Sequence, residues 1–337
     1  MCKQANLLEW QVIKLIYLLK LILKEEGLPR SSDRLIMRKW KETREKMGRE
    51  YDAYTLKAVQ EIELEMLECF LEICEKHDLT YFAFAGTGIG ALRHGGFIPW
   101  DDDIDINMPR KDFEKFVEIA KRDYGDRYYF LNATTDEHYP LMTTRWCKKG
   151  TVFWEESLKG VPCKFGIFLD LYPMDEVSDD PKKLRRQAMP AWFWSKIMIL
   201  REVPYPVLPF QGMTKKVIHG ICACVHVLLK TFHVSHNWLY GRCMAACTKY
   251  NGVGTDTLGY LCSSQPYEDV LKKSQVYPLK KLKFEHLELN FPNKIEEMLT
   301  ATYGDYMKLP PAEKRKNHFP YRLELGDYTP GRKAENE

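Results

Sequence analysis

The chain has 337 residues, and its 50 Lys and Arg residues nearly balance its 47 Asp and Glu residues, which leaves a formal charge of +3. Hydrophobic residues make up 45% of the chain and charged residues 29%, a composition that indicates a folded globular protein and excludes a collagenous, disulfide-rich or largely disordered chain. The near-neutral charge also argues against a basic nucleic-acid-binding surface, so we expect no nucleic-acid partner.

The first segment, residues 1–50, is predicted to form an amphipathic helix followed by a charged connector. Between residues 7 and 23 the apolar side chains fall on one arc of a helix, while Glu9, Lys14 and Lys20 lie on the rest of its circumference. These charges, and an apolar stretch shorter than a bilayer requires, argue against a membrane-spanning helix. We expect either a helix that lies on a membrane surface or a terminal helix that packs on protein.

The hydrophobic periodicity of the rest of the chain predicts a fold of the α+β class, a mixed sheet flanked by helices. Residues 51–180 are predicted to contain helices at 52–77, 89–94 and 110–124, a turn at 86–88, and strands at 81–85, 103–108, 128–132, 141–146, 151–155 and 167–171. Residues 181–260 are predicted to be a helical insertion. A strand pair at 282–291 and a helix at 293–303 predict that residues 261–337 complete the core domain.

The insertion has two apolar stretches, at residues 192–208 and 217–232, that are rich in aromatic residues and broken by prolines. A buried helical subdomain would explain them. A surface that contacts a membrane would explain them as well, and the neighbouring Trp192, Trp194 and Lys196 slightly favour that interpretation, because such side chains gather at the membrane–water interface.

The ten cysteines do not follow the spacing of a disulfide framework, which indicates a reducing compartment. Cys222, Cys224 and His226 offer three metal-ligating side chains close together in the sequence. Their spacing matches no common structural zinc motif and lies in an apolar, helix-like run. We therefore favour buried thiols over a zinc site there.

The chemistry of the sequence is concentrated in residues 99–106. Asp101, Asp103 and Asp105 occupy alternate positions, and alternate residues of a strand project from the same side. Converging carboxylates repel one another, and a hard divalent cation such as Mg²⁺ or Mn²⁺ is the usual compensation. A calcium loop is disfavoured because Ile106 occupies the position that requires glycine, and a solvated acidic turn is the other alternative.

A phosphate-binding turn precedes this acidic segment. Gly86, Thr87 and Gly88 stand between a predicted strand and a short helix, where backbone N–H groups can bind a phosphate. The residues also match a dinucleotide-binding fingerprint, but the following helix is too short for it. The pattern better matches nucleotidyltransferase-fold enzymes of phosphoryl transfer, whose third carboxylate comes from a later strand. Asp170 is the candidate for that carboxylate, with a turn-capping role as its alternative.

The sequence GTGIGALRHGGFIPWDDDID at residues 86–105 resembles the core motif of the LicD family of phosphocholine transferases, whose eukaryotic relatives include fukutin and fukutin-related protein. The resemblance extends over roughly residues 60–180 and 275–320. The chain departs from the family pattern at Gly88, where a bulkier apolar residue is usual, and residues 185–260 match nothing in that pattern.

This resemblance implies a nucleotidyltransferase-like catalytic core and transfer of a phospho-alcohol, either phosphocholine or an alditol phosphate. The donor would be its CDP-activated form, the acceptor a sugar hydroxyl of a cell-surface or lipid-linked glycan, and the released product CMP. The implied Mg²⁺ or Mn²⁺ ligands are Asp101, Asp103, Asp105 and Asp170. The implied catalytic residues are Asp103, Asp105, Asp170 and Arg93, and the implied donor-binding residues are Gly86, Thr87, Gly88, His94 and His318.

Several alternatives remain at this stage. Arg93 could pair structurally with Asp101 or Asp102 instead of binding a phosphate. The same carboxylates would also support a nucleotidyltransferase that releases pyrophosphate, and a catalytically inactive scaffold on a membrane is the third possibility. We expect a cytoplasmic protein that associates peripherally with the inner face of the membrane.

Overall fold

The structure is a computed structural model that describes residues 51–208, 211–264, 267, 269–312, 315 and 317–328. The chain divides into two units after Glu50, and the described residues all belong to the second unit. The helix and connector predicted within residues 1–50 lie outside the described residues.

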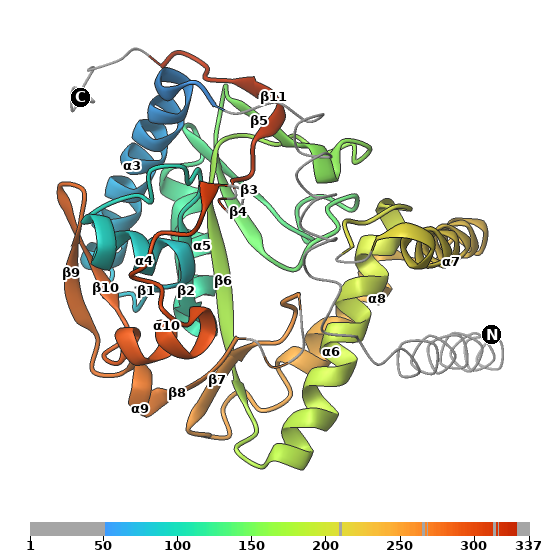
Figure 1. Ribbon diagram of the computed structural model, residues 1–337. Coiled ribbons are helices and arrows are strands. Elements are labelled where there is room, and N and C mark those ends of the chain that lie inside the picture. The colour runs from blue at the N-terminus through green and yellow to red at the C-terminus, as the bar shows by residue number, and fades with distance from the viewer. Residues whose placement is uncertain are drawn as a thin grey trace. The chain divides into compact units, whose positions relative to one another are not determined.

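The second unit is built on a seven-stranded mixed sheet and two additional strand pairs (Figure 1). The strands are β1 Phe82–Ala83, β2 Asp105–Pro109, β3 Tyr128–Leu131, β4 Thr144–Lys148, β5 Val152–Glu155, β6 Phe168–Val177, β7 Thr257–Tyr260, β8 Asp269–Lys272, β9 Lys280–Phe284, β10 Leu287–Phe291 and β11 Pro320–Glu324. The large sheet has the order β1-β2-β6-β4-β3, and β2 and β6 are its parallel pair. The two smaller pairs are β9 with β10 and β5 with β11.

β6 is the central strand of the large sheet, and it has different neighbours along its length. Its first part pairs with β2 on one side and β4 on the other, whereas its last residues, Asp175 to Val177, pair with β7. In that last part Val177 is paired with Thr257, and β7 in turn pairs with β8. The chain therefore leaves the sheet at the end of β6 and returns beside the same point.

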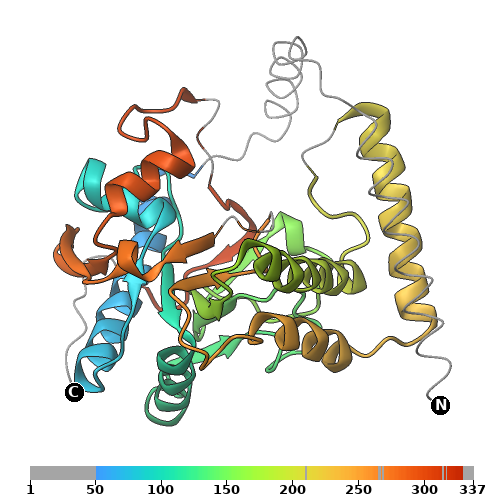
Figure 2. The ribbon, with the colours of Figure 1, turned by 90° about the horizontal axis from the view of Figure 1, so that it is seen from below.

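Some helices cover the sheet, and the helices within residues 181–247 form a group of their own at one side (Figure 2). They are α3 Ala53–Lys76, α4 Ala85–His94, α5 Arg110–Asp123, α6 Pro181–Glu202, α7 Gly212–Thr231, α8 His236–Cys247, α9 Lys273–Val276 and α10 Ile295–Tyr303. α3 contacts β6 and α5, and α5 also contacts β2, β3 and β6. α6 packs against α8 and α7, while α4 contacts β9 and α10.

The core between the sheet and its helices is aromatic. The rings of Phe70 in α3 and Phe116 in α5 lie 4.8 Å apart, and Phe116 meets Trp146 of β4 edge to face at 5.3 Å. All three side chains are fully buried. Edge-to-face pairs of this kind add to the hydrophobic stabilisation of the burial itself, and they fix α3 and α5 on one face of the sheet.

Most elements predicted from the sequence are present within a few residues of their predicted bounds. The predicted helix at 52–77 is α3, where the side chain of Asp52 accepts a hydrogen bond from the backbone N–H of Thr55 at 2.9 Å. The predicted helix at 293–303 is α10, which ends at Gly304 with a positive φ of 69°. The segment predicted as a helical insertion contains α6, α7 and α8.

Two predicted elements differ from the structure. Residues 86–88, predicted as a turn, form part of the first turn of α4. The strand predicted at 167–171 continues to Val177, because its acidic residues find partners within the fold. Asp175 pairs with Arg110, and Glu176 pairs with Lys273.

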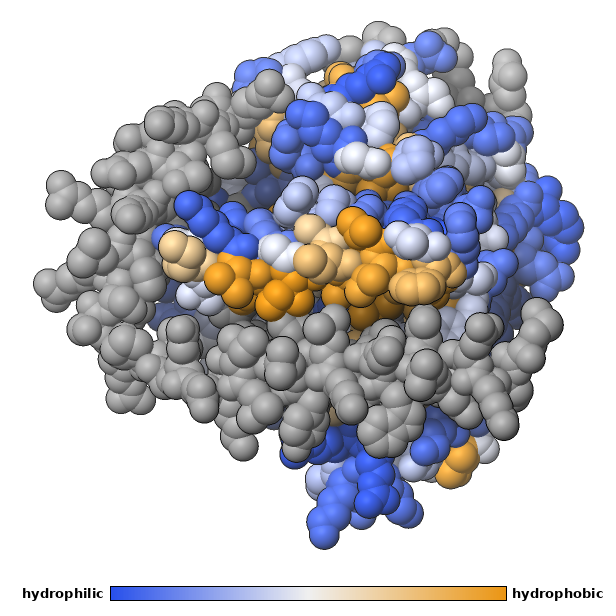
Figure 3. Space-filling model, turned by 90° about the vertical axis from the view of Figure 1, so that its right-hand side faces the viewer, coloured by the Kyte–Doolittle hydropathy of each residue, from blue (hydrophilic) through white to orange (hydrophobic). Residues whose placement is uncertain are grey.

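α7 is the described helix that is long and apolar enough to cross a membrane by length and composition. Only 6% of its apolar window is buried within the protein. The exposed apolar residues of the helix and its C-cap are Met213, Val217, Val227, Leu228 and Phe232. Seen from the side on which α7 lies in Figure 1, apolar side chains gather in one band (Figure 3).

Candidate active site

The parallel pairing of β2 with β6 places Asp105 directly beside Asp170. Neighbouring strands lie about 4.8 Å apart, so carboxylates at paired positions are close neighbours. The residues that flank them, such as Ile106 and Leu169, are buried in the core and fix both strands. The fold thus brings the Asp-x-Asp segment and the later candidate acid to one place.

Asp101, Asp102 and Asp103 lie in the loop that leads into β2, which starts at Asp105 and not at Asp103 as predicted. Asp102 is completely buried. Its carboxylate accepts a hydrogen bond from the hydroxyl of Tyr51 at 2.8 Å and another from the backbone N–H of His318 at 2.7 Å. Asp102 therefore anchors two distant segments to the acidic loop.

His318 joins the acidic cluster through its side chain. Its Nδ1 lies 3.3 Å from Oδ2 of Asp103 and 3.5 Å from Oδ1 of Asp102. Burial opposes a charge on this imidazole, but the two carboxylates outweigh it and hold the pKa of His318 well above its ordinary value. His318, proposed from the sequence as a donor-binding residue, is thus part of the site, next to the predicted metal ligands.

The carboxylates of the cluster are buried close together, and this raises their pKa values. Burial and then the charges of Asp102 and Asp105 raise the pKa of Asp101 to about 7. The pKa of Asp103 is raised to about 8, mainly by burial, and burial and the neighbouring Asp103 and Asp170 hold the pKa of Asp105 well above its ordinary value. At neutral pH such a cluster requires either bound protons or a bound cation.

The donor set fits a hard divalent cation. Carboxylate oxygens are the ligands that Mg²⁺ and Mn²⁺ prefer, and one oxygen of Asp170, Oδ1, is buried without a hydrogen-bond partner. Among the described residues, Asp102, Asp103 and His318 each offer one potential ligand atom, and these three atoms lie within 4.8 Å of one another. The predicted ligands Asp103, Asp105 and Asp170 lie next to this group, but their carboxylate oxygens do not all come within 4.8 Å of one another.

Arg145, which the sequence analysis missed, lies opposite Asp170 in the pairing of β4 with β6. Its Nη2 lies 2.6 Å from Oε2 of Glu155, its Nε lies 3.5 Å from Oδ1 of Asp170, and its guanidinium lies 3.8 Å from the ring centroid of Phe168. Burial would disfavour the guanidinium charge, but the two carboxylates hold the pKa of Arg145 well above its ordinary value. A charge beside Trp146 and Cys147 in a predicted strand was the signal in the sequence, because an arginine buried there requires a partner.

Glu63 of α3 was missed for a similar reason. It is almost completely buried and faces the acidic loop from the helix side. Burial, and then the nearby charges of Asp103 and Asp102, raise its pKa well above the ordinary value. Glu63 follows Val59 by four residues and therefore lies on the apolar face of α3. A charged residue at a position that faces the core was thus visible in the sequence.

The first turn of α4 contacts the acidic segment. The hydroxyl of Thr87 accepts a hydrogen bond from the backbone N–H of Asp105 at 3.0 Å, so Thr87 positions the start of β2. Gly86 is required by close approach, because a Cβ atom there would lie 2.9 Å from Oδ2 of Asp101. The N–H groups of Gly86 and Thr87 are at the helix N-terminus, where intrahelical acceptors are lacking.

Gly88 has a packing role in the structure. Its N–H donates to the carbonyl of Phe84 at 3.1 Å. A Cβ atom at Gly88 would lie 2.9 Å from Cδ1 of Ile295, so α10 packs directly against α4 at this position.

Arg93 and His94 lie at the other end of α4. Arg93 donates from Nη1 to the carbonyl of Tyr306 at 2.6 Å and from Nε to Nε2 of His94 at 2.9 Å. These contacts replace the structural ion pair with Asp101 or Asp102 that was the alternative role for Arg93. The guanidinium groups of Arg93 and Arg315 both lie over the ring of Trp100, with centroid distances of 5.9 and 4.5 Å.

The zinc alternative at Cys222, Cys224 and His226 is wrong. The three residues follow one another along α7, where Cys222 is buried and Cys224 is exposed. Nδ1 of His226 lies 2.9 Å from the carbonyl oxygen of Leu200. Residues two apart on a helix point in different directions, so these side chains do not converge.

Comparison with known proteins agrees with this geometry. Residues 78–184, which include α4, β2 and β6, match the family model described as the LicD/FKTN/FKRP nucleotidyltransferase domain. The chain is 29% identical over 273 residues to lipopolysaccharide cholinephosphotransferase LicD of Haemophilus influenzae, a match that covers 78% of this chain and 96% of that protein.

Two shorter similarities are to uncharacterised proteins of Rickettsia. One, from Rickettsia typhi, is 42% identical over 48 residues, which is 14% of this chain and 16% of that protein. The other, from Rickettsia prowazekii, is 44% identical over 41 residues, which is 12% of this chain and 15% of that protein. The match of residues 78–184 to the LicD domain model and the similarity to LicD over most of the chain support membership of the LicD family.

Proposed function

We propose that the protein transfers a phospho-alcohol, either phosphocholine or an alditol phosphate, from a CDP-activated donor to a sugar hydroxyl of a cell-surface or lipid-linked glycan, with release of CMP. The match to the LicD domain model and the similarity to a LicD cholinephosphotransferase support a LicD-type phosphotransferase and phosphocholine transfer in general. The observation that carries the finer proposal is the placement of Asp105 beside Asp170, next to a buried acidic loop.

Asp103, Asp105 and Asp170, with Asp101 at the edge, would hold the divalent cation. Bound there, Mg²⁺ or Mn²⁺ would neutralise charge on the donor pyrophosphate and on the departing CMP. The raised pKa values of Asp101 and Asp103 support this assignment, because a cation removes the repulsion that raises them.

Asp170 also has a suitable environment to act on the acceptor. It would either complete the metal site or accept the proton of the attacking sugar hydroxyl. Burial raises the pKa of Asp170, and Arg145, whose Nε lies 3.5 Å from its carboxylate, opposes that shift and so favours the ionised form that either role requires. Arg145 is itself held between Asp170 and Glu155, so it acts as a positioning residue and does not need to contact substrate.

Donor phosphate would bind between the two ends of α4. The N-terminus of the helix offers the N–H groups of Gly86 and Thr87 beside Asp101 and Asp105, where a phosphate bridged to the cation would lie. From the other side, Arg93 would contact the phosphate that leaves on the alcohol, because a guanidinium matches phosphate geometry.

Peripheral attachment to the inner face of the membrane, with a cytoplasmic location, is part of the proposal. The exposed apolar side chains of α7 support it, and so do Lys215 and Lys216 in its first turn, since cationic side chains beside apolar ones favour an anionic lipid surface.

The decisive experiment follows the products of labelled CDP-choline or a CDP-alditol incubated with the full chain, Mn²⁺ and glycan acceptors. We expect CMP and an acceptor heavier by one phospho-alcohol unit. The variants Asp105→Asn and Asp170→Asn should each lower turnover by about 10²- to 10³-fold, because they remove charge stabilisation of the transition state. Asp126→Asn, at an exposed position, is the matched control and should retain turnover.

Two results would refute the proposal. Consumption of CTP with release of pyrophosphate would show that the protein is a nucleotidyltransferase. Full turnover in Asp105→Asn would show that the acidic strand does not hold the catalytic cation.

Membrane attachment is tested by sedimentation of the full chain with anionic vesicles. Val217→Asp and Leu228→Asp place charges on the exposed face of α7 and should reduce co-sedimentation, whereas Val253→Asp, at an exposed loop position, should not. Equal sedimentation of all three variants would exclude α7 as the contact.

A further inference from the structure

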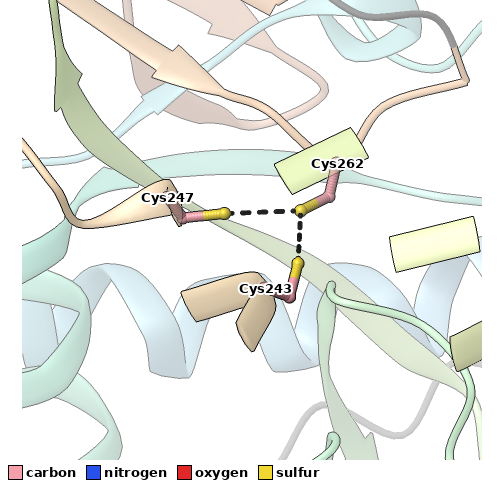
Figure 4. Close-up of side chains that lie close together, drawn as sticks. All are labelled: Cys243, Cys247 and Cys262. Carbon is pink, nitrogen blue, oxygen red and sulfur yellow. Dashed lines mark hydrogen bonds between the residues drawn. The ribbon is translucent and has the colours of Figure 1, made fainter. Parts of the chain in front are cut away.

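A second cluster of potential ligands lies outside the active site and consists of three cysteines (Figure 4). Cys243 and Cys247 are one turn apart on the same face of α8, and Cys262 follows β7. The sulfur of Cys262 lies 3.5 Å from that of Cys243 and 3.6 Å from that of Cys247. All three are buried, so the sulfur atoms converge inside the protein.

These distances exclude a disulfide and fit both hydrogen-bonded thiols and a metal–thiolate site. A disulfide has a sulfur–sulfur distance of about 2.05 Å, so no pair in the cluster is bonded. Zinc–thiolate bonds are about 2.3 Å long, which in a tetrahedral site places the sulfur atoms about 3.8 Å apart. The observed separations are therefore within a few tenths of an ångström of those in a metal–thiolate site.

The surroundings of the cluster suit a soft cation. Lys196 donates hydrogen bonds to the carbonyls of Cys262 and Ser263, at 3.2 and 2.7 Å, and so places a positive charge near the three thiols, where it would favour their thiolate form. A cavity of about 260 Å³ lies beside the cluster, and its lining includes Cys247 and Cys262 together with Met142 and Met244. It offers a path for an ion and either a thioether or a water molecule as a fourth ligand.

We propose that Cys243, Cys247 and Cys262 form a binding site for a thiolate-preferring metal ion of the zinc class, separate from the carboxylate site. On binding, three S–H bonds are lost, three metal–sulfur bonds form, and three protons pass to solvent. Thiolates discriminate against Mg²⁺ and Mn²⁺, so the two sites take different metals. The ion would connect α8, at the end of the helical insertion, to the segment that follows β7.

The test uses Co²⁺ as a spectroscopic probe of the reduced full chain. Cobalt bound by thiolates shows sulfur-to-metal charge-transfer absorption and the intense visible bands of a tetrahedral ion, whereas cobalt bound by the carboxylate site shows no sulfur charge transfer. We expect these bands to saturate at one equivalent of thiolate-bound Co²⁺ and to disappear when Zn²⁺ is added. Each of Cys243→Ser, Cys247→Ser and Cys262→Ser should abolish them, while Cys74→Ser, at a buried cysteine of α3, should retain them.

A second measurement uses the unaltered protein, so it stands even where a serine variant fails to fold. Alkylation of the native chain, followed by mass spectrometry, should show that Zn²⁺ protects these three cysteines at least tenfold and leaves exposed Cys224 equally reactive. Absence of sulfur-to-cobalt absorption, or equal alkylation with and without Zn²⁺, would overturn the proposal. A disulfide within the cluster in freshly isolated protein would also overturn it.

Discussion

Replacing Thr87 by valine keeps the size of a buried side chain but removes the hydroxyl that accepts a hydrogen bond from the backbone N–H of Asp105. The N–H group would then lack a partner in a largely buried place, which costs about 1–3 kcal/mol of the free energy of unfolding. Thr87→Ser keeps the hydroxyl and loses one methyl group, so its cost should stay near ~1 kcal/mol.

The two variants separate the hydrogen bond from the packing. Denaturant unfolding of the metal-free protein should show the larger loss in Thr87→Val. Turnover should also fall about 10- to 100-fold in that variant and much less in Thr87→Ser, because a small displacement of the Asp105 backbone moves a catalytic carboxylate. If Thr87→Val matches Thr87→Ser in both stability and turnover, the hydroxyl does not position Asp105.

Two further predictions concern buried charges. Burial raises the pKa of Asp101 to about 7 and that of Asp103 to about 8, so the folded metal-free protein keeps protons that the unfolded chain releases above about pH 4. The free energy of unfolding should therefore fall as the pH rises towards 8. Mn²⁺ should raise the melting temperature more at about pH 8 than at about pH 5. Asp175→Asn removes the negative charge that accepts two hydrogen bonds from the guanidinium of Arg110, at 2.7 and 2.9 Å. Denaturant unfolding should show a loss of about 3–5 kcal/mol in the free energy of unfolding, because the guanidinium stays buried without its charge partner. Asp126→Asn, at an exposed position, should leave the free energy of unfolding almost unchanged.

The acidic strand and its partner could be predicted from the sequence because their signals are local. The alternation that follows Asp105 indicates one strand, although its predicted start at Asp103 was two residues early, and a single acid within the apolar run around Asp170 indicates a second strand. The helix periodicity of α3 and α10 is equally local. For such segments the spacing of the buried positions indicates whether the segment is a helix or a strand, and the structure has the element that the spacing indicates.

The rest of the site depends on contacts between distant segments. Arg145 and Glu155 come together with Asp170 through the register of β4 and the fold of β5, and no spacing in the sequence encodes that register. His318 reaches Asp103 across more than two hundred residues. What the sequence does reveal for Arg145 is a charge at an apolar position, which predicts a partner without naming it.

The cysteines show the same limit. Cys222 and Cys224 are close in the sequence but two apart on a helix, whereas Cys243 and Cys247 have the spacing that places two side chains on one helix face. Their third member, Cys262, follows β7, and only the return of the chain to the sheet brings it to α8.

The pairing of Val177 with Thr257 means that the chain enters and leaves its helical excursion at hydrogen-bonded neighbours. In topological terms α6, α7 and α8 form an oversized hairpin loop between two antiparallel strands. Closure of the loop is provided by the sheet, so its interior can change length and composition at little cost to the strands. A change within this module would therefore leave in place the register that sets Asp105 beside Asp170.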